Sequence, residues 1–259
     1  MRSRIGRKFG ELKKAQGKAF IPYVMAGDPD IRRTADLVHI LEDCGADIIE
    51  LGVPFSDPLA DGPTIQAAAT RAVEGGTTLH TVIECVSSLR KRTQVPIALM
   101  TYYNPVFRYG DERFVEDAVS AGADGVIIPD LPPEEAEGLM SRTKKKPFDT
   151  IFLLAPTSTE ERIRKVAHAS RGFIYYVSIT GITGTKLSLD PSIGAHIAQI
   201  RSVSDTPVAV GFGISTPEEA SLVSGFADGV IVGSAIVKKI NGPEEELKKY
   251  LRALRNGIS

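Results

Sequence analysis

Two carboxylates that lie close together in the sequence are candidates for acid–base chemistry. Glu50 lies inside the apolar run 47–53, and Asp61 lies in the segment 54–63, which contains three prolines and a glycine. Ionising a carboxyl group among apolar residues is costly, so the pKa of Glu50 should rise toward the range of a general acid or base. Asp61 can reach back over the same site from its loop. We therefore expect the two carboxylates to share an active site.

Each carboxylate could also have a structural role and no catalytic one. Glu50 could be a structural acid that is paired with an arginine or with backbone N–H groups. Asp61 could be the N-cap of a helix that begins at Gly62-Pro63-Thr64. Asp57, directly before Pro58, is more typical of a turn residue. The residues alone leave these alternatives open.

Glycines cluster where the later apolar runs end, and they suggest a phosphate site. Glycine lets an anion approach backbone N–H groups closely, and barrels often bind phosphate after their seventh and eighth strands. We therefore expect a phosphorylated substrate. The clusters are Gly181-Ile182-Thr183-Gly184, Gly211-Phe212-Gly213 and Gly233-Ser234.

Three tyrosines lie in apolar runs and offer a lining for an aromatic substrate. They are Tyr23, Tyr102 and Tyr175. As plain core residues they would have the same pattern, so this interpretation also stays open.

These residues must be positioned by the elements that contain them, and apolar runs alternate with amphipathic stretches along the whole chain. Most runs are apolar on both faces, which is typical of parallel strands covered by helices. Eight such units in 259 residues predict an α/β fold. We expect a (β/α)8 barrel as a single domain over residues 1–259, with an N-terminal helix and an extra helix after the second strand. A doubly wound sheet is disfavoured because no GxGxxG follows the first strand. The eight runs are 20–26, 47–53, 96–102, 125–130, 150–155, 173–179, 207–214 and 229–237.

A weak internal repeat supports the barrel and locates an insertion. Gly45-Ala46-Asp47, Gly122-Ala123-Asp124 and Phe226-Ala227-Asp228 each lead into an apolar run. The last two aspartates are 104 residues apart over four units, whereas the first two are 77 apart over only two. About 25 extra residues therefore follow the second or third strand. Segment 53–96 has room for two helices, and insertions in barrels usually serve the active face.

Alternation along the second strand predicts the direction of Glu50. Ile49, Leu51 and Val53 share the face that suits packing against helices. Glu50 should therefore point into the barrel near its C-terminal end, where catalytic residues of this fold lie.

Composition and missing motifs exclude several functional classes. The chain has 31 Lys and Arg against 32 Asp and Glu, so we expect no broad electrostatic binding of nucleic acid or membrane. Neither a spanning apolar run nor a secretory signal is evident. The two cysteines and four scattered histidines indicate reduced thiols in the cytoplasm and no metal site. Without strand lysines, a dinucleotide fingerprint or a nucleophile–base pair, carboxylate acid–base chemistry on a phosphorylated metabolite remains.

Several stretches, in order along essentially the whole chain, resemble the tryptophan synthase alpha chain family. The most specific is Glu50-Leu51-Gly52-Val53-Pro54-Phe55-Ser56-Asp57-Pro58. The others are Pro22–Pro29, Tyr102–Pro105, Pro129–Pro132, Gly181–Gly184, Gly211–Ile214 and Gly233–Ile236.

This resemblance implies a lyase of L-tryptophan biosynthesis that cleaves indole-3-glycerol phosphate to indole and D-glyceraldehyde 3-phosphate, a retro-aldol reaction. Glu50 matches the family's general acid and base. Asp61 matches the carboxylate that binds the indole N–H and stabilises the protonated ring. No cofactor is expected on this chain. By position, Tyr23, Met100, Tyr102, Ile127, Leu153, Tyr175 and Thr183 would bind the substrate, and Gly184, Gly213, Gly233 and Ser234 its phosphate.

The resemblance also implies a partner. The family works as an alpha2-beta2 tetramer with a beta chain that holds pyridoxal phosphate and receives indole through a tunnel. The loops after the second and sixth strands would close over substrate. Ile179 departs from members that carry arginine at that position. The residues expected at the partner interface are Phe55, Asp57, Pro58, Asn104, Pro105 and Phe107.

Three other functions compete with this one. The chain could be a stand-alone lyase that releases free indole, although the partner-facing prolines argue mildly against it. It could be a non-catalytic barrel that binds phosphorylated metabolites, although keeping Glu50 and Asp61 argues against that. A sugar-phosphate isomerase on the same fold is the third.

Overall fold

The strands form one parallel sheet. The computed structural model describes residues 3–178, 192–211 and 213–258. Within these ranges the strands are ordered β5-β4-β3-β2-β1-β9-β8-β7-β6, and every neighbouring pair is parallel. Their bounds are β1 Ala19–Met25, β2 Ile49–Gly52, β3 Ile97–Met100, β4 Gly125–Ile127, β5 Asp149–Ile151, β6 Leu153–Leu154, β7 Ile174–Val177, β8 Val208–Gly211 and β9 Gly229–Val232.

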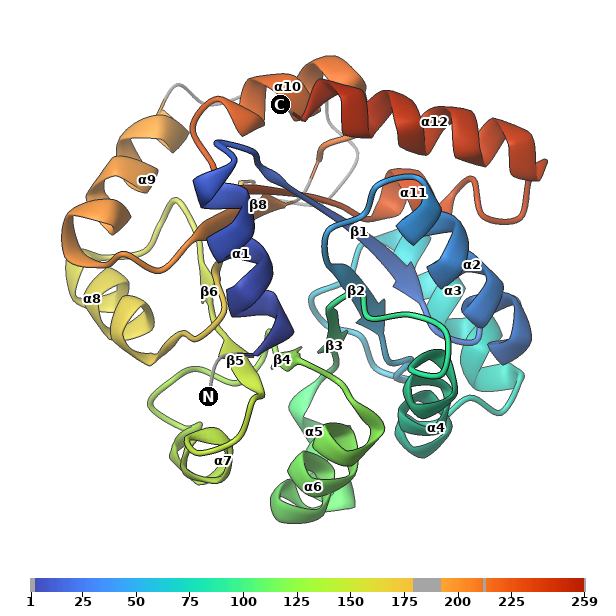
Figure 1. Cartoon of the computed structure of the whole chain (residues 1–259). Helices are drawn as coiled ribbons and strands as arrows, with labels where there is room; N and C mark the ends of the chain where they lie inside the picture. The colour runs from blue at the N-terminus through green and yellow to red at the C-terminus, as the bar shows by residue number, and fades with distance from the viewer. Residues whose placement is uncertain (1–2, 179–191, 212, 259) are drawn as a thin grey trace.

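The sheet closes on itself between β5 and β6. These two strands stand at opposite ends of the strand order, yet only Phe152 separates them in the chain. The chain pairs with β4 before Phe152 and with β7 after it. The predicted run 150–155 is therefore one barrel strand with a break, and the eight-unit prediction is confirmed as a (β/α)8 barrel (Figure 1).

The helices surround this ring, as Figure 1 shows. Two of them, α3 and α4, fill the predicted insertion between β2 and β3, so the predicted extra segment is confirmed. A short helix that the sequence analysis did not predict, α5, precedes α6 after β3. The bounds are α1 Arg4–Lys14, α2 Ile31–Asp43, α3 Pro63–Glu74, α4 Leu79–Leu89, α5 Tyr103–Tyr109, α6 Asp111–Ala121, α7 Glu137–Thr143, α8 Glu160–Ala169, α9 Ser192–Val203, α10 Pro217–Ser224, α11 Ser234–Val237 and α12 Glu244–Gly257.

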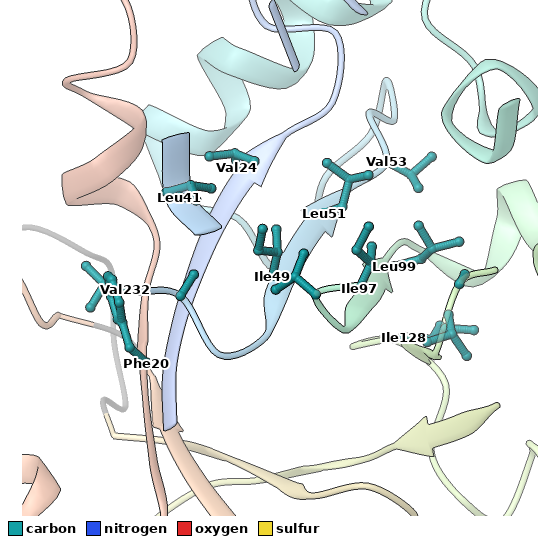
Figure 2. Close-up of a cluster of buried hydrophobic side chains, with 14 of the residues drawn as sticks. Phe20, Val24, Leu41, Ile49, Leu51, Val53, Ile97, Leu99, Ile128 and Val232 are labelled. Atoms are coloured by element: carbon teal, nitrogen blue, oxygen red, sulfur yellow. The ribbon is translucent and has the colours of Figure 1, made fainter. Parts of the chain in front are cut away.

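The core has two parts, one on each face of the sheet. Ile49, Leu51 and Val53 belong to the outer part between strands and helices, beside Ile97 and Leu99 of β3 (Figure 2). Alternate residues of the same strands fill the inside of the barrel, which is the pattern that a parallel barrel requires. The predicted orientation of the second strand is therefore confirmed.

Helix α1 closes the amino-terminal end of the barrel. Its residues Ile5 and Phe9 pack among the inward-facing side chains of the strands. In Figure 1 this helix, in dark blue, lies across the ring. Ser3 caps the helix and donates a hydrogen bond to Asp149. The predicted N-terminal helix is confirmed, and it leaves the carboxyl ends of the strands as the open face.

The repeated aspartates have one structural role in common. Asp47, Asp124 and Asp228 each accept a hydrogen bond from a backbone N–H at or near the start of the adjacent strand. Each also pairs with an arginine, at 3.2, 2.8 and 2.8 Å respectively. The repeat therefore fixes neighbouring strands at the amino-terminal face, where residues of this fold serve stability.

No helix in the described part of the chain is both long enough and apolar enough to cross a membrane.

Candidate active site

Glu50 points into the barrel, and its carboxyl group has no hydrogen-bond partner among the described residues. It lies on β2 between Tyr23 of β1 and Ala98 of β3. The residue is 1% exposed, and neither carboxyl oxygen has a hydrogen-bond partner among the described residues. The alternative of a structural glutamate paired with an arginine or with backbone donors is therefore wrong for the described structure. A buried, unpaired carboxyl needs a functional explanation.

Burial and, to a smaller extent, the nearby charge of Asp61 together raise the pKa of Glu50 to about 8. Removal from water disfavours the carboxylate, and a second negative charge adds to the cost. At neutral pH the side chain is therefore mostly a neutral carboxylic acid, which can donate a proton.

Asp61 approaches the same space from the loop after β2. The N-cap of α3 is Gly62, and no side chain caps that helix, so Asp61 is not a capping residue. Burial raises the pKa of Asp61, whereas a hydrogen bond with Tyr102 lowers it. Its backbone carbonyl accepts a hydrogen bond from Nε2 of Gln66 at 2.8 Å. The two carboxylates thus meet in one site but in different surroundings.

Tyr102 holds the loop that carries Asp61. It follows β3 as the N-cap residue of α5, so it lies just past the strand in which the sequence analysis placed it. Its hydroxyl oxygen accepts a hydrogen bond from the N–H of Ala60 at 2.9 Å. Its ring lies 5.6 Å from that of Phe55. Tyr102 therefore ties both halves of the loop to the mouth of the barrel.

A cleft of about 230 Å3, counting the space that opens to solvent, lies at the carboxyl ends of the strands. Glu50 is not among its described lining residues, but its neighbour across the sheet, Tyr23, is. It is lined from β1, from the loop after β2, and from the ends of β3 and β4. Of the predicted residues, Tyr23, Asp61, Met100 and Tyr102 line it. The complete lining is Tyr23, Met25, Val53, Asp61, Met100, Thr101, Tyr102 and Pro129.

Three other predicted residues lie one layer lower, inside the barrel. Ile127, Leu153 and Tyr175 belong to the inner core rather than to the cleft. Tyr175 pairs with Leu153 in the adjacent strand, and burial, then the charge of Glu50, raises the pKa of its hydroxyl. These side chains form the floor around Glu50.

The sequence analysis missed four lining residues: Met25, Val53, Thr101 and Pro129. Each ends a strand or follows one by one or two positions. A rule that selects every residue at the carboxyl end of a predicted strand would have found them. Val53 was predicted only as an outward core residue, and it belongs to that core as well.

The predicted phosphate residues lie at the ends of β8 and β9. Gly213 has a φ of +77°, a conformation that glycine adopts without strain. Gly233 is the N-cap of α11, so the predicted run 229–237 is wrong as a single strand: β9 ends at Val232 and a helical turn follows. Thr183, Gly184 and Ile179 lie outside the described residues.

The residues predicted to face a partner lie beside the cleft. Phe107 is 68% exposed, and Asp57 and Asn104 are also exposed. Phe55, Pro58 and Pro105 are half-buried. An exposed phenylalanine beside polar residues is a feature of protein interfaces.

Fold and site together define a class of protein. It is a (β/α)8 barrel whose open face holds a neutral buried carboxylic acid below a loop carboxylate, a pair suited to general acid–base catalysis. Among the described residues, no three His, Cys, Asp or Glu side chains lie together as a metal site would require.

Comparison with known proteins narrows this class to one family. The family model described as "Tryptophan synthase alpha chain" matches residues 9–257. The tryptophan synthase alpha chain of Geotalea uraniireducens is 52% identical, with 99% of this chain and 98% of that protein covered. That of Geobacter sulfurreducens is 51% identical, with 99% of each covered. The chain belongs to the tryptophan synthase alpha chain family.

Solved structures agree with this membership. The tryptophan synthase subunit alpha of Legionella pneumophila has 39% identity and a TM-score of 0.91, with 100% of this chain and 99% of that chain covered. A chain of tryptophan synthase from M. tuberculosis has 35% identity and a TM-score of 0.91, with coverages of 99% and 100%.

Membership defines the reaction. The alpha chain is a lyase that cleaves indole-3-glycerol phosphate in tryptophan biosynthesis. It needs no cofactor of its own and pairs with a beta chain, which holds the pyridoxal phosphate.

Proposed function

We propose that Glu50 and Asp61 carry out this cleavage as an acid–base pair. The observation that carries the proposal is the buried carboxyl of Glu50, which lacks a hydrogen-bond partner among the described residues and has a pKa raised to about 8. A group of this kind is mostly protonated at neutral pH, yet it can exchange its proton within the working range.

In the first step, the neutral Glu50 carboxyl protonates C3 of the indole ring. The ring becomes a cation with its charge largely at nitrogen, and the ionised Asp61 accepts the hydrogen bond of the indole N–H. A negative charge at that point stabilises the cation as it forms. The location of Asp61 at the mouth of the cleft supports this role.

In the second step, the Glu50 carboxylate takes the proton of the glycerol hydroxyl next to the ring. The hydroxyl oxygen becomes the aldehyde oxygen, and the bond between that carbon and C3 breaks. Its electron pair returns to the ring and restores neutral indole. The proton lost in the first step is regained in the second, so Glu50 ends in its starting state.

The substrate would lie across the strand ends. Tyr23, Met100 and Tyr102 would contact the indole, with Ile127, Leu153 and Tyr175 as the floor. Gly213, Gly233 and Ser234 would bind the phosphate, together with Gly184, and Thr183 would be a further contact of the substrate. The family's substrate supports this arrangement, as does the location of Met100 at the end of β3 and of Gly233 directly after β9.

The assembly would be an alpha2-beta2 tetramer in the cytoplasm, with the whole of residues 1–259 as one barrel domain. The surface of Phe55, Asp57, Pro58, Asn104, Pro105 and Phe107 would contact the beta chain. The exposure of Phe107 and its proximity to the cleft support that surface.

The experiment that tests the function is indole release from indole-3-glycerol phosphate by the purified chain, with and without a beta chain. We expect slow release that accelerates strongly when the beta chain is added. Fast release without any response would indicate a stand-alone lyase. No release in either condition would contradict the proposal.

A further inference from the structure

A buried aspartate outside the cleft is bound by an arginine of helix α3. The side chain of Asp28, just after β1, is 0% exposed. Its two oxygens accept hydrogen bonds from Nε and Nη2 of Arg71, both at 2.8 Å. A bidentate pair of this kind fixes orientation as well as distance. It therefore links β1 to α3 in one defined geometry.

The segment that carries Asp28 is itself firmly held. Gly27 donates its N–H to Oγ1 of Thr34, a buried residue of α2, at 2.9 Å. A Cβ atom at Gly27 would lie 2.0 Å from Oγ1 of Thr77, so the backbone here packs closely against the turn after α3. Asp28 thus gives Arg71 a fixed anchor.

Apolar packing alone fixes the position of α3 only weakly. Its fully buried residues are all alanines (Ala68, Ala69 and Ala72), and with the partly buried Ile65 they pack against Tyr23 and Met25 of β1. Alanine side chains make few contacts and interlock little with their neighbours. A directional ion pair therefore contributes more to fixing the position of α3 than it would in a helix that packs through large side chains.

Helix α3 leads directly to the loop carboxylate. It begins at Pro63, two residues after Asp61. Its residue Gln66 donates a hydrogen bond from Nε2 to the backbone carbonyl of Asp61 at 2.8 Å. A shift of α3 is therefore transmitted to the backbone of Asp61 by a covalent connection and by a hydrogen bond.

We propose that Arg71, anchored by Asp28, is a positioning residue of the lyase reaction: it fixes α3 and so directs Asp61 at the cleft. This inference rests on the proposed role of Asp61. Arg71 does not line the cleft and acts only through the helix.

The test is single-turnover indole release by Arg71→Gln in the complex with the beta chain, with enzyme in excess so that slow variants stay measurable. We expect the rate to fall about 10- to 100-fold, because a misplacement of roughly 1 Å is enough for such a loss. Arg71→Lys keeps the positive charge but not the two-pronged geometry of the guanidinium group, so its rate should lie between those of Arg71→Gln and the wild type. The matched control is Arg201→Gln, which removes a 2.8 Å pair with Asp228 on the far face and should leave the rate unchanged.

A double-variant cycle with Asp61→Asn separates positioning from a merely structural role. If Arg71 acts through Asp61, the loss in the double variant should be close to that of Asp61→Asn alone. Losses that multiply would overturn the inference, as would a wild-type rate in Arg71→Gln, even with a lower melting temperature. A wild-type rate in Asp61→Asn alone would instead overturn the proposed function.

Discussion

At the scale of the residue, the proposed chemistry depends on the burial of one carboxyl group, which makes its ionisation unfavourable. Glu50 is buried, and its carboxyl oxygens have no hydrogen-bond partner among the described residues, so its charged form is disfavoured. Burial raises the pKa of Asp61 as well, but a hydrogen bond with Tyr102 offsets part of that increase. Two carboxyl groups thereby lie in different surroundings, and the proposed mechanism uses Glu50 as the acid and Asp61 to stabilise positive charge.

The raised pKa of Glu50 predicts a particular dependence of stability on pH. The pKa is about 8 in the folded protein against 4.5 for an unperturbed glutamate. Between these values the folded state keeps a proton that the unfolded chain has released. The free energy of unfolding therefore falls as the pH rises through this window, by as much as about 1.4 kcal/mol per pH unit, and levels off above it.

Glu50→Gln lacks this titration, so its stability relative to the wild type should increase by a few kcal/mol from pH 5 to pH 8. Urea unfolding of both proteins at the two pH values measures the difference. Glu116→Gln, at an exposed position of α6, serves as the control and should show no such trend. A constant difference between Glu50→Gln and wild type would contradict the raised pKa.

At the scale of the element, the sequence predicted the number and order of strands because each is buried on both faces. It predicted the inward direction of Glu50 because strands alternate with period 2. It did not predict the break at Phe152 or the end of β9 at Val232. The first depends on how the chain turns where the barrel closes, and the second on where a helix begins. A run of apolar residues does not predict either position.

The lining of the cleft was only partly predictable for a related reason. Tyr23, Asp61, Met100 and Tyr102 have chemical character or were matched to a substrate role, whereas Thr101 has neither and Pro129 was matched only as part of the stretch Pro129–Pro132. Their roles come from where β3 and β4 end relative to their neighbours. That register is a property of the closed sheet rather than of any one segment.

The repeated aspartates give a prediction at this scale. Asp124 is almost fully buried, pairs with Arg90 and Arg4, and accepts the N–H of Ile97. Asp124→Asn should lower the free energy of unfolding by about 3 kcal/mol, because it leaves buried positive charge unmatched. Urea unfolding measures the loss, and the kcat of indole release should stay unchanged.

The control is Asp228→Asn, where the side chain is 34% exposed and solvent screens the ion pair. Its loss of stability should be clearly smaller. Equal losses at the two positions would show that burial does not determine the contribution of these pairs.

At the scale of the whole molecule, the two faces of the barrel have different tasks. The amino-terminal face is closed by α1 and by aspartate–arginine pairs. The carboxyl-terminal face holds the cleft, the loop of Asp61 and the exposed side chain of Phe107. Because the proposed partner surface adjoins the loop of Asp61, binding of the beta chain can influence the site directly.

Phe107→Ala should weaken binding of the beta chain at least about tenfold, because exposed aromatic residues often contribute most to interfaces. The measurement is a titration of the beta chain with indole release as the signal; the rate without the beta chain should not change. Leu222→Ala, at a 56% exposed position on α10, is the control for loss of apolar surface. An unchanged affinity in Phe107→Ala would place the interface elsewhere.

The most direct test of the central claim is single-turnover indole release by Glu50→Gln in the complex with the beta chain. Glutamine keeps the shape of the side chain but has no acidic proton to give. We predict a rate at least about 100-fold below that of the wild type, with binding of D-glyceraldehyde 3-phosphate retained. A rate close to that of the wild type would contradict the acid–base role of Glu50.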